Sequence, residues 1–309
     1  MQNRYRRSTR TKGAEVTTVA FIGLGIMGSP MAGHLIDAGF DVVGFNRSPD
    51  KVEALVERGG RGAASAAEAA QDADIVALMV PDSPDVEAVL TGEDGVFGAA
   101  GEGTLIIDFS SIRPDVAAGL AEQAAGHGLR MIDAPVSGGE AGAVAATLSI
   151  MVGGEPADFE AAKPVLHAVG KTVVHVGPSG SGQTVKAANQ LIVAGNIQLL
   201  AEAVVFLEAF GVDMEAALRV LGGGLAGSKV LDQKGENMLN RSFEPGFRVE
   251  LHHKDLGIVT SAAREAGVVI PVGAVVGQLM ASLRATGDGG LDHSALLRGV
   301  LRLSGRDPD

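Results

Sequence analysis

The stretch VAFIGLGIMGSPMAGHL, residues 19–35, decides the fold, because a strand-like apolar run, a glycine-rich turn and a helix start follow one another in it. Gly23, Gly25 and Gly28 have the spacing G-x-G-x-x-G. In such a unit the first glycine permits a tight turn, the second lets a pyrophosphate approach the backbone, and the third lets helix and strand pack closely. A helix N-terminus also favours anions. We therefore predict that a dinucleotide contacts this turn, at Gly23, Leu24, Gly25, Ile26, Met27 and Gly28.

The chain after this turn alternates between short apolar runs and helical stretches. The runs of strand length lie at 17–23, 40–46, 73–80, 103–110, 129–136, 148–155 and 171–177. The intervening stretches have Ser or Pro near their starts and Gly at their ends, which is typical of helices. Nearly continuous apolar runs are typical of parallel strands that are covered on both faces. The pattern predicts an α/β fold with a Rossmann-type doubly wound sheet.

The second part of the chain has a different character. Strand-like runs all but vanish after residue 177, and long helical stretches such as 183–210 and 255–266 follow. We predict a dinucleotide-binding domain over 16–178 and an all-helical domain for substrate binding and oligomerisation over 179–306. The opening residues 1–15 are basic but lack the apolar face of a targeting helix, so we expect a disordered, solvated tail there.

The bulk composition narrows the range of partners. A length of 309 residues suits two domains. The net charge of -12 argues against nucleic acid, because phosphate binding relies on clustered Lys and Arg. No run of about 18 uncharged apolar residues occurs, so we expect no membrane span. Cysteine is absent, which excludes disulfides and thiolate chemistry and fits a cytoplasmic location.

The end of the second predicted strand bears on which dinucleotide binds. An acidic residue there would bind the ribose hydroxyls of NAD, but this chain has Asn46, Arg47 and Ser48. A carboxylate would repel a 2′-phosphate, whereas Arg47 can pair with one through charge-assisted hydrogen bonds. We therefore favour NADP over NAD as the cofactor. The alternative for Arg47 is a solvated surface charge.

Two further strand ends are expected at the same crevice, since ligands bind outside the carboxyl ends of parallel strands. One offers Met79, Val80 and Pro81, and the other offers Ser110 and Ser111. Each segment also fits an ordinary strand-to-helix turn.

The tripeptide Ser137-Gly138-Gly139 follows another predicted strand. It exposes a hydroxyl and lightly shielded N–H groups, and such a stretch can bind a small carboxylate as an anion nest. A plain loop explains two glycines equally well.

Lys186 lies near the start of an apolar helix, where a lysine needs either a route to water or a partner. It shares a helix face with Asn189 and Gln190 at spacings of three and four. Gly180 and Gly182 allow this helix to begin tight against the nucleotide domain, so the ammonium is expected to face the crevice between the domains. There a lysine can stabilise charge on a carbonyl oxygen that accepts hydride, and donate the proton. Partial burial would lower its pKa toward the working pH; the alternative is a lysine that extends into solvent.

A second candidate cation, Lys254, stands next to Asp255. An exposed ion pair and a lysine that reaches cofactor or substrate both fit this placement. The adjacent His252 and His253 point in different directions on a helix. With no H-E-x-x-H motif and no cysteine, we expect no metal.

Taken together, these motifs resemble the β-hydroxyacid dehydrogenase family, and within it the tartronate semialdehyde reductases. The resemblance runs from Val19 to about Arg302 and rests on five segments, FIGLGIMGSPMAGHL, DAPVSGGEAGA, GSGQTVKAANQ, HHKDLG and LDHSALLR. It implies a helical C-terminal domain like that of 6-phosphogluconate dehydrogenase. It also implies homodimers or homotetramers that form largely through the helical domain.

The resemblance also implies roles for individual residues. Lys186 would be the catalytic acid/base, Ser137, Gly138 and Gly139 would bind a substrate carboxylate, and Lys254 would contact cofactor or substrate. Many relatives have an Asn four residues after the catalytic lysine, whereas here Gln190 occupies that place and Asn189 precedes it. Either amide is therefore a candidate for binding the substrate hydroxyl.

The implied reaction is NAD(P)-dependent reduction of 2-hydroxy-3-oxopropanoate to glycerate. The nearest alternative is a 3-hydroxyisobutyrate dehydrogenase, which does the same chemistry on a methyl-bearing substrate. A non-catalytic NADP-binding module and an imine reductase are further alternatives, and the lysine at position 186 disfavours both.

Overall fold

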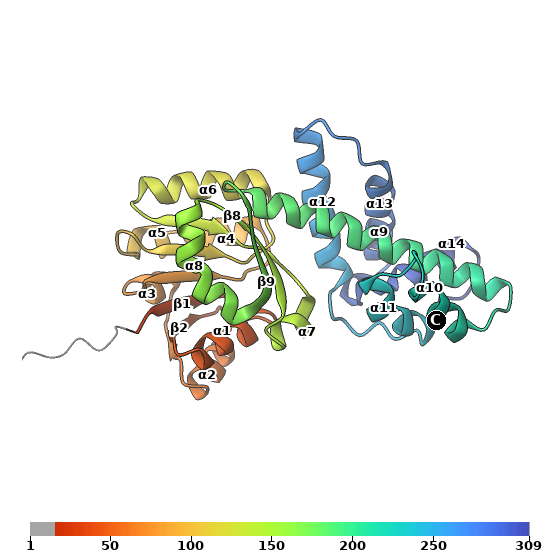
Figure 1. Cartoon of the computed structure of the whole chain (residues 1–309), viewed down its shortest axis with the longest axis horizontal. Helices are drawn as coiled ribbons and strands as arrows, with labels where there is room; N and C mark the ends of the chain where they lie inside the picture. Colours follow the sequence, from red (N-terminus) through yellow and green to blue (C-terminus); the bar gives the residue numbers. More distant parts are fainter. Residues whose placement is uncertain (1–15, 309) are drawn as a thin grey trace, which may run out of the picture.

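The computed structural model describes residues 16–308, so the tail expected at 1–15 lies outside the described residues. The described chain forms a sheet covered by helices, followed by a second part made of helices (Figure 1). One long helix, α9 (Ser181–Ala209), begins against the sheet and extends through the second part. The predicted α/β domain followed by an all-α domain is confirmed.

The sheet has the strand order β3-β2-β1-β4-β5-β6-β8-β7, with β9 paired to β8. The strands of its parallel part are β1 (Thr18–Ile22), β2 (Asp41–Phe45), β3 (Arg61–Gly62), β4 (Ile75–Leu78), β5 (Leu105–Asp108) and β6 (Arg130–Asp133). This 3-2-1-4-5-6 order is the doubly wound arrangement, in which the chain reverses its direction of travel between β1 and β4. The ends of β1 and β4 therefore border the expected binding crevice.

The other edge of the sheet is mixed in direction. It consists of β7 (Val136–Ser137), β8 (Leu148–Gly153) and β9 (Gly170–Gly177). β8 runs antiparallel to β6 and β7, and β9 runs parallel to β8. The sequence predicted that the runs at 148–155 and 171–177 continue the sheet, but their reversed direction arises in the connection between β7 and β8, which contains Gly139–Val144, and apolar periodicity does not report it.

Both faces of the parallel part are buried. Val19 and Phe21 of β1 face a core that includes Met31 of α1 (Gly28–Asp37) and Leu166 of α8 (Pro156–Val169). Ala20 and Ile22 face the opposite core, because successive side chains of a strand point to opposite faces. That second core is covered by α3 (Ala66–Ala70), α4 (Ser83–Thr91), α5 (Val96–Ala99) and α6 (Pro114–Gly126). Two further helices, α2 (Pro49–Glu57) and α7 (Gly139–Val144), lie in the same domain.

The helical domain packs around α9. Its other helices are α10 (Met214–Gly222), α11 (Lys229–Leu239), α12 (Val249–Glu265), α13 (Pro271–Ala285) and α14 (Leu296–Leu303), with short 3-10 turns at Asp288–Gly290 and His293–Ala295. Ala194, Ile197, Ala201 and Val204 of α9 are fully buried in the core of this domain. Among the described residues, α9 alone is long and apolar enough to cross a membrane by length and composition, and 44% of its most apolar window is buried inside the protein.

A buried carboxylate fixes the start of α9 against the sheet. Asp133, at the end of β6, accepts hydrogen bonds from the backbone N–H groups of Gly180 (2.7 Å) and Gln183 (2.8 Å). The Gln183 side chain accepts from the N–H of Ile112 (3.1 Å) and donates to the carbonyl of Ser110 (2.8 Å). The first turn of α9 is thereby bonded to the carboxyl ends of two neighbouring strands, β5 and β6.

The approach of α9 to the sheet leaves no room for a side chain at Gly182. A Cβ there would collide with the Met151 carbonyl oxygen and lie 2.7 Å from Oδ2 of Asp133. We expect Gly182→Ala to lower the free energy of unfolding by about 1–3 kcal/mol, because the helix must move off the sheet. Urea unfolding followed by circular dichroism measures this change.

Gly119→Ala is the matched control, since Gly119 lies inside α6 with nothing within 4 Å of its Cβ position. It should raise stability by about 0.5–1 kcal/mol, as alanine does in a helix interior. Equal effects of the two substitutions would contradict the close contact at Gly182.

Candidate active site

The glycine turn between β1 and α1 has the geometry that a dinucleotide requires. Gly23 has φ of 97°, and a Cβ there would collide with the carbonyl oxygen of Met79. A Cβ at Gly28 would collide with the carbonyl oxygen of Gly23. At Gly25, by contrast, nothing lies within 4 Å of the Cβ position. Two glycines therefore serve packing, and the middle one leaves open space where a pyrophosphate can approach the backbone.

The end of β2 is bonded to this turn. Oδ1 of Asn46 accepts a hydrogen bond from the N–H of Leu24 (3.0 Å), and Nδ2 of Asn46 donates to the carbonyl of Ser48 (3.2 Å). The Arg47 side chain is 83% exposed and lies 3.7 Å from Asp85 in a surface ion pair. Such an exposed pair contributes little energy, so the guanidinium is free to turn toward a phosphate.

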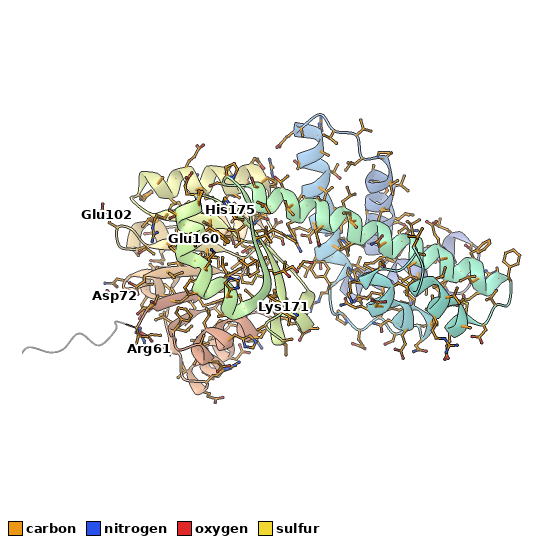
Figure 2. The ribbon with its side chains drawn as sticks, viewed as in Figure 1. Arg61, Asp72, Glu102, Glu160, Lys171 and His175 are labelled. Atoms are coloured by element: carbon orange, nitrogen blue, oxygen red, sulfur yellow. The ribbon has the colours of Figure 1, made fainter. Side chains whose placement is uncertain are left out.

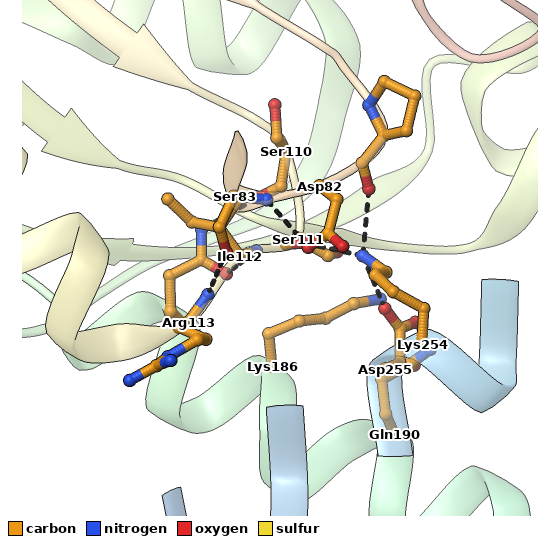
Figure 3. A network of polar contacts seen from close by, with 12 residues as sticks. Asp82, Ser83, Ser110, Ser111, Ile112, Arg113, Lys186, Gln190, Lys254 and Asp255 are labelled. Atoms are coloured by element: carbon orange, nitrogen blue, oxygen red, sulfur yellow. Dashed lines mark hydrogen bonds and ion pairs between the residues drawn. The ribbon is translucent and has the colours of Figure 1, made fainter. Parts of the chain in front are cut away.

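The ends of β4 and β5 lie side by side and are reached by a lysine from the helical domain. The N–H of Val80 donates to Oγ of Ser110 (3.0 Å). Nζ of Lys254 donates to the carbonyls of Pro81 (3.0 Å) and Ser111 (2.7 Å), as Figure 3 shows. Lys254 thus contacts two of the segments that the sequence predicts at the cofactor, and it bonds the two domains together.

Lys186 is buried at the boundary between the domains. Its side chain is 9% exposed, and Nζ donates to the carbonyl of Val136 (2.7 Å). It borders a narrow cavity lined by Ser111, Ile112, Gln183, Lys186, Ala187, Gln190, Asp255 and Ile258. Figure 3 shows its side chain extending toward Asp255 and Lys254. The amine therefore lies at the crevice beside the strand ends.

The pKa of Lys186 is lowered from its ordinary value to about 8. Burial is the main cause, because a buried ammonium loses hydration. The positive charge of Lys254 lowers the pKa further, while the negative charge of Asp255 raises it. An amine with this pKa changes protonation near neutral pH, as a general acid or base should.

The loop at Ser137 lies next to Lys186 and α9. Gly138 and Gly139 have φ of 140° and 61°, so both adopt backbone conformations that favour glycine. Oγ of Ser137 donates to Oδ1 of Asn189, at 3.3 Å. The structure therefore brings this loop, Asn189 and the region of Lys186 together, although they come from separate segments of the chain.

The two candidate amides are arranged differently. Asn189 is half-buried and faces the Ser137 loop, whereas Gln190 is buried. Nε2 of Gln190 donates to Oδ2 of Asp255 (2.5 Å), and its Oε1 accepts from Nδ2 of Asn189 (2.8 Å). Both amides make their side-chain hydrogen bonds within the protein, and Asn189 is the more exposed of the two and the one that contacts the Ser137 loop.

Sequence reasoning missed several polar residues that support the site. Asp108 ends β5, is fully buried, and accepts from the N–H of Ser110 (2.9 Å); burial raises its pKa to about 7. His252 is fully buried, its Nδ1 is 3.0 Å from Nδ1 of His293, and its Nε2 lies 3.2 Å from the carbonyl of Gln190. A polar residue at the end of an apolar run was the available signal for Asp108 and Asp133. No comparable signal marked the histidine pair.

Within residues 16–308 no group of three or more His, Cys, Asp or Glu side chains is arranged to hold a metal ion. His252 and His293 instead share a hydrogen bond with each other. Burial lowers the pKa of His252, so its ring is neutral at physiological pH.

Comparison with known proteins extends these observations. Residues 18–177 match the family described as the NAD binding domain of 6-phosphogluconate dehydrogenase, and residues 180–300 match the one described as NAD-binding of NADP-dependent 3-hydroxyisobutyrate dehydrogenase. A 2-hydroxy-3-oxopropionate reductase of Escherichia coli is 43% identical over 282 residues, 91% of this chain and 96% of that protein. A 3-hydroxyisobutyrate dehydrogenase of Pseudomonas aeruginosa is 36% identical over 91% of this chain and 97% of its own.

A solved structure of Mycobacterium tuberculosis 3-hydroxyisobutyrate dehydrogenase with L-serine has a TM-score of 0.85 and 34% sequence identity, and the match covers 92% of this chain and 99% of that one. Fold, glycine turn and relatives together define an NAD(P)-dependent oxidoreductase that acts on CH–OH groups. The chain belongs to the β-hydroxyacid dehydrogenase family and is 3-hydroxyisobutyrate dehydrogenase-like, as its motifs predicted.

The lowered pKa of Lys186 predicts opposite pH profiles for the two directions of catalysis. With Lys186 as the expected proton donor, kcat/KM for reduction should fall by about tenfold per pH unit above the pKa of about 8. With the neutral amine as the expected proton acceptor, kcat/KM for oxidation should rise with pH up to the same point. Steady-state rates across this range measure both limbs.

The Lys186→Arg variant is the control, because a guanidinium stays charged throughout the accessible pH range. It should lose the limb near pH 8 in both directions. A wild-type profile without an inflection would rule out Lys186 as the titrating group.

Proposed function

We propose that this protein reduces 2-hydroxy-3-oxopropanoate to glycerate, reversibly, with Lys186 as the acid/base. The observation that carries the proposal is the placement of one buried amine of lowered pKa, which shares a narrow cavity with Ser111 at a strand end and bonds to the carbonyl of Val136, next to Ser137. The 43% identity to a reductase of that name supports the choice of substrate.

The residues of the site would have separate roles in this reduction. The bound nicotinamide would supply the hydride. Lys186 would stabilise the developing negative charge on the carbonyl oxygen and give up its proton to it. Ser137, Gly138 and Gly139 would hold the substrate carboxylate with their hydroxyl and N–H groups. L-serine, bound to a solved relative, is also a small carboxylate with a hydroxyl group.

A 3-hydroxyisobutyrate dehydrogenase is the second candidate, since a relative of that name is 36% identical over 91% of the chain. The substrates of the two candidate enzymes differ only in a hydroxyl or a methyl group at one carbon, and a hydrophobic pocket discriminates weakly between groups of such similar size. A non-catalytic NADP-binding module would have no need of a buried lysine at the crevice, and burying one is costly.

Lys186→Ala should lower kcat by about 10²–10⁴-fold, because it removes the proton donor. Binding of NADPH, followed by fluorescence titration, should stay within a few-fold of the wild type, since the glycine turn is untouched. Lys163→Ala is the matched control: Lys163 pairs with Glu160 on α8, within the first domain, where Figure 2 labels Glu160. Near-normal turnover of the Lys186→Ala variant would refute the proposed role.

We also propose NADP as the preferred cofactor, through Arg47. The strand end carries this exposed guanidinium and no carboxylate to bind the ribose hydroxyls or repel a 2′-phosphate. Arg47→Ala should raise KM for NADPH by about 10-fold or more, the value of a charge-assisted hydrogen bond. KM for NADH on the same variant serves as the internal control and should change by less than about 3-fold. An equal change for both cofactors would argue against contact with the 2′-phosphate.

The proposal includes assembly into homodimers or homotetramers through the helical domain. Ile192, Leu199 and Phe206 recur every seven residues along α9, and each is more than half exposed. Val272 and Val275 of α13 are equally exposed and share a shallow groove with Leu199. Large apolar side chains gathered in this way are typical of protein interfaces.

A further inference from the structure

Asn189, Gln190 and Asp255 form a chain of hydrogen bonds whose direction is fixed. Oδ2 of Asp255 accepts from Nε2 of Gln190 at 2.5 Å. Oε1 of Gln190 accepts from Nδ2 of Asn189 at 2.8 Å. Oδ1 of Asn189 in turn accepts from the hydroxyl of Ser137 at 3.3 Å. This chain of hydrogen bonds therefore runs from the buried Asp255 carboxylate to the Ser137 loop.

The carboxylate at one end determines the orientation of both amides. Oδ1 of Asp255 lies 2.9 Å from Nζ of Lys254 in an ion pair, and the oxygens of a carboxylate only accept hydrogen bonds. Gln190 must then turn its NH₂ group toward Asp255, which leaves its carbonyl oxygen to face Asn189. Asn189 must then donate to that oxygen from its own NH₂ group. Its carbonyl oxygen is left pointing toward Ser137.

Reversing either amide is costly in this environment. A reversed Gln190 would place its oxygen against the Asp255 carboxylate and its NH₂ against that of Asn189. Gln190 is 5% exposed, so water cannot replace the lost partners. The Gln190 main chain is also held, because its carbonyl accepts from Nε2 of the neutral, buried His252.

We propose that this chain of hydrogen bonds makes Asn189 a dedicated hydrogen-bond acceptor. As an acceptor, Asn189 would select substrates with a hydroxyl group on the carbon next to the reacting carbonyl. The inference rests on the proposed function, whose substrate carries such a hydroxyl at C2. A methyl group in that position has no donor, so the single Ser137 hydroxyl could serve either the Asn189 oxygen or the substrate carboxylate, and the other acceptor would lack this partner, at a cost in binding. Gln190 is thus a positioning residue, and it does not itself contact the substrate.

A substrate hydroxyl could readily replace the Ser137 hydroxyl as the donor to Asn189. An O–H···O bond in proteins is most often about 2.7–2.8 Å long, so the 3.3 Å contact with Ser137 is weak. When a substrate hydroxyl donates to Asn189, the Ser137 hydroxyl becomes free to donate to the substrate carboxylate. The hydroxyl and the carboxylate of the substrate then both find partners without any rearrangement of α9.

The length of the side chain at position 190 matters for this arrangement. An asparagine there would be one methylene shorter and would not span from Asn189 to Asp255. The direction of the Asn189 amide would then no longer be imposed by the carboxylate. The departure from the common family pattern at Gln190 therefore has a specific chemical consequence.

The test compares two substrates on matched variants. Gln190→Leu keeps most of the volume and removes both hydrogen bonds, and Asn189→Leu removes the acceptor itself. Gln123→Leu, at an exposed position on α6, is the control for the same change elsewhere. For each variant, kcat/KM is measured for reduction of 2-hydroxy-3-oxopropanoate and of 2-methyl-3-oxopropanoate.

The ratio of the two kcat/KM values, hydroxyl over methyl, should fall by about 10-fold or more in Gln190→Leu and in Asn189→Leu, and stay unchanged in Gln123→Leu. Adding Asn189→Asp to Gln190→Leu should restore the ratio, because a carboxylate accepts in either orientation, even though its charge lowers both rates. Equal losses for both substrates in Gln190→Leu, or no rescue by Asn189→Asp, would overturn the inference.

The proposed function is judged separately, by the wild type. A wild-type enzyme that prefers 2-hydroxy-3-oxopropanoate, with a ratio insensitive to position 190, supports the proposed function and overturns the inference. If the wild type reduces neither aldehyde, the proposed function fails. The inference is then decided by the dissociation constants of glycerate and 3-hydroxyisobutyrate, measured calorimetrically on the NADP⁺ complexes of the same variants. Their ratio should shift by about 10-fold or more in the same direction, and an unchanged ratio overturns the inference.

Discussion

The contact between the Asp133 carboxylate and the first turn of α9 is the constraint on which the active site depends. Two backbone N–H groups at the start of the helix donate hydrogen bonds to this one side chain, at 2.7 and 2.8 Å. A helix N-terminus carries partial positive charge, so the pairing is favourable although burial raises the pKa of Asp133. Lys186 and Asn189 follow within the next turns of α9, and their positions relative to the nucleotide domain are set by this attachment.

The charges of the site form a small group of two lysines and one carboxylate. Lys186 and Lys254 are both close to Asp255, and Lys254 also bonds to two backbone carbonyls of the first domain. Burial is the main reason that Lys186 loses its proton more readily, and these charges adjust that effect, because electrostatic interactions are strong where water is scarce. The same Asp255 carboxylate orients the Gln190 amide. One side chain thus links the acid/base chemistry to the recognition of the substrate.

The sequence predicted the parts of the site whose chemistry is local. The turn at Gly23, Gly25 and Gly28 is recognisable because its backbone requirements are met within six residues, and Lys186 stands out because a cation is unusual in an apolar helix. Asp133 and Gln183 were not predicted, since their role arises only when β6 and α9 meet in space. The roles of Asn189 and Gln190 were left open for the same reason. Both lie on one helix face, and only the position of Asp255, 65 residues further along the chain, distinguishes them.

The length of α9 has a mechanical consequence. The helix is unbroken over 29 residues, which at the standard rise per residue corresponds to about 43 Å. A stiff rod of that length transmits small tilts, and its two ends cannot adjust independently. Sequence changes near Phe206, remote from any reacting atom, can therefore reposition the amine at the opposite end. Substitutions in that distal region are thus a way to change turnover without altering the pocket itself.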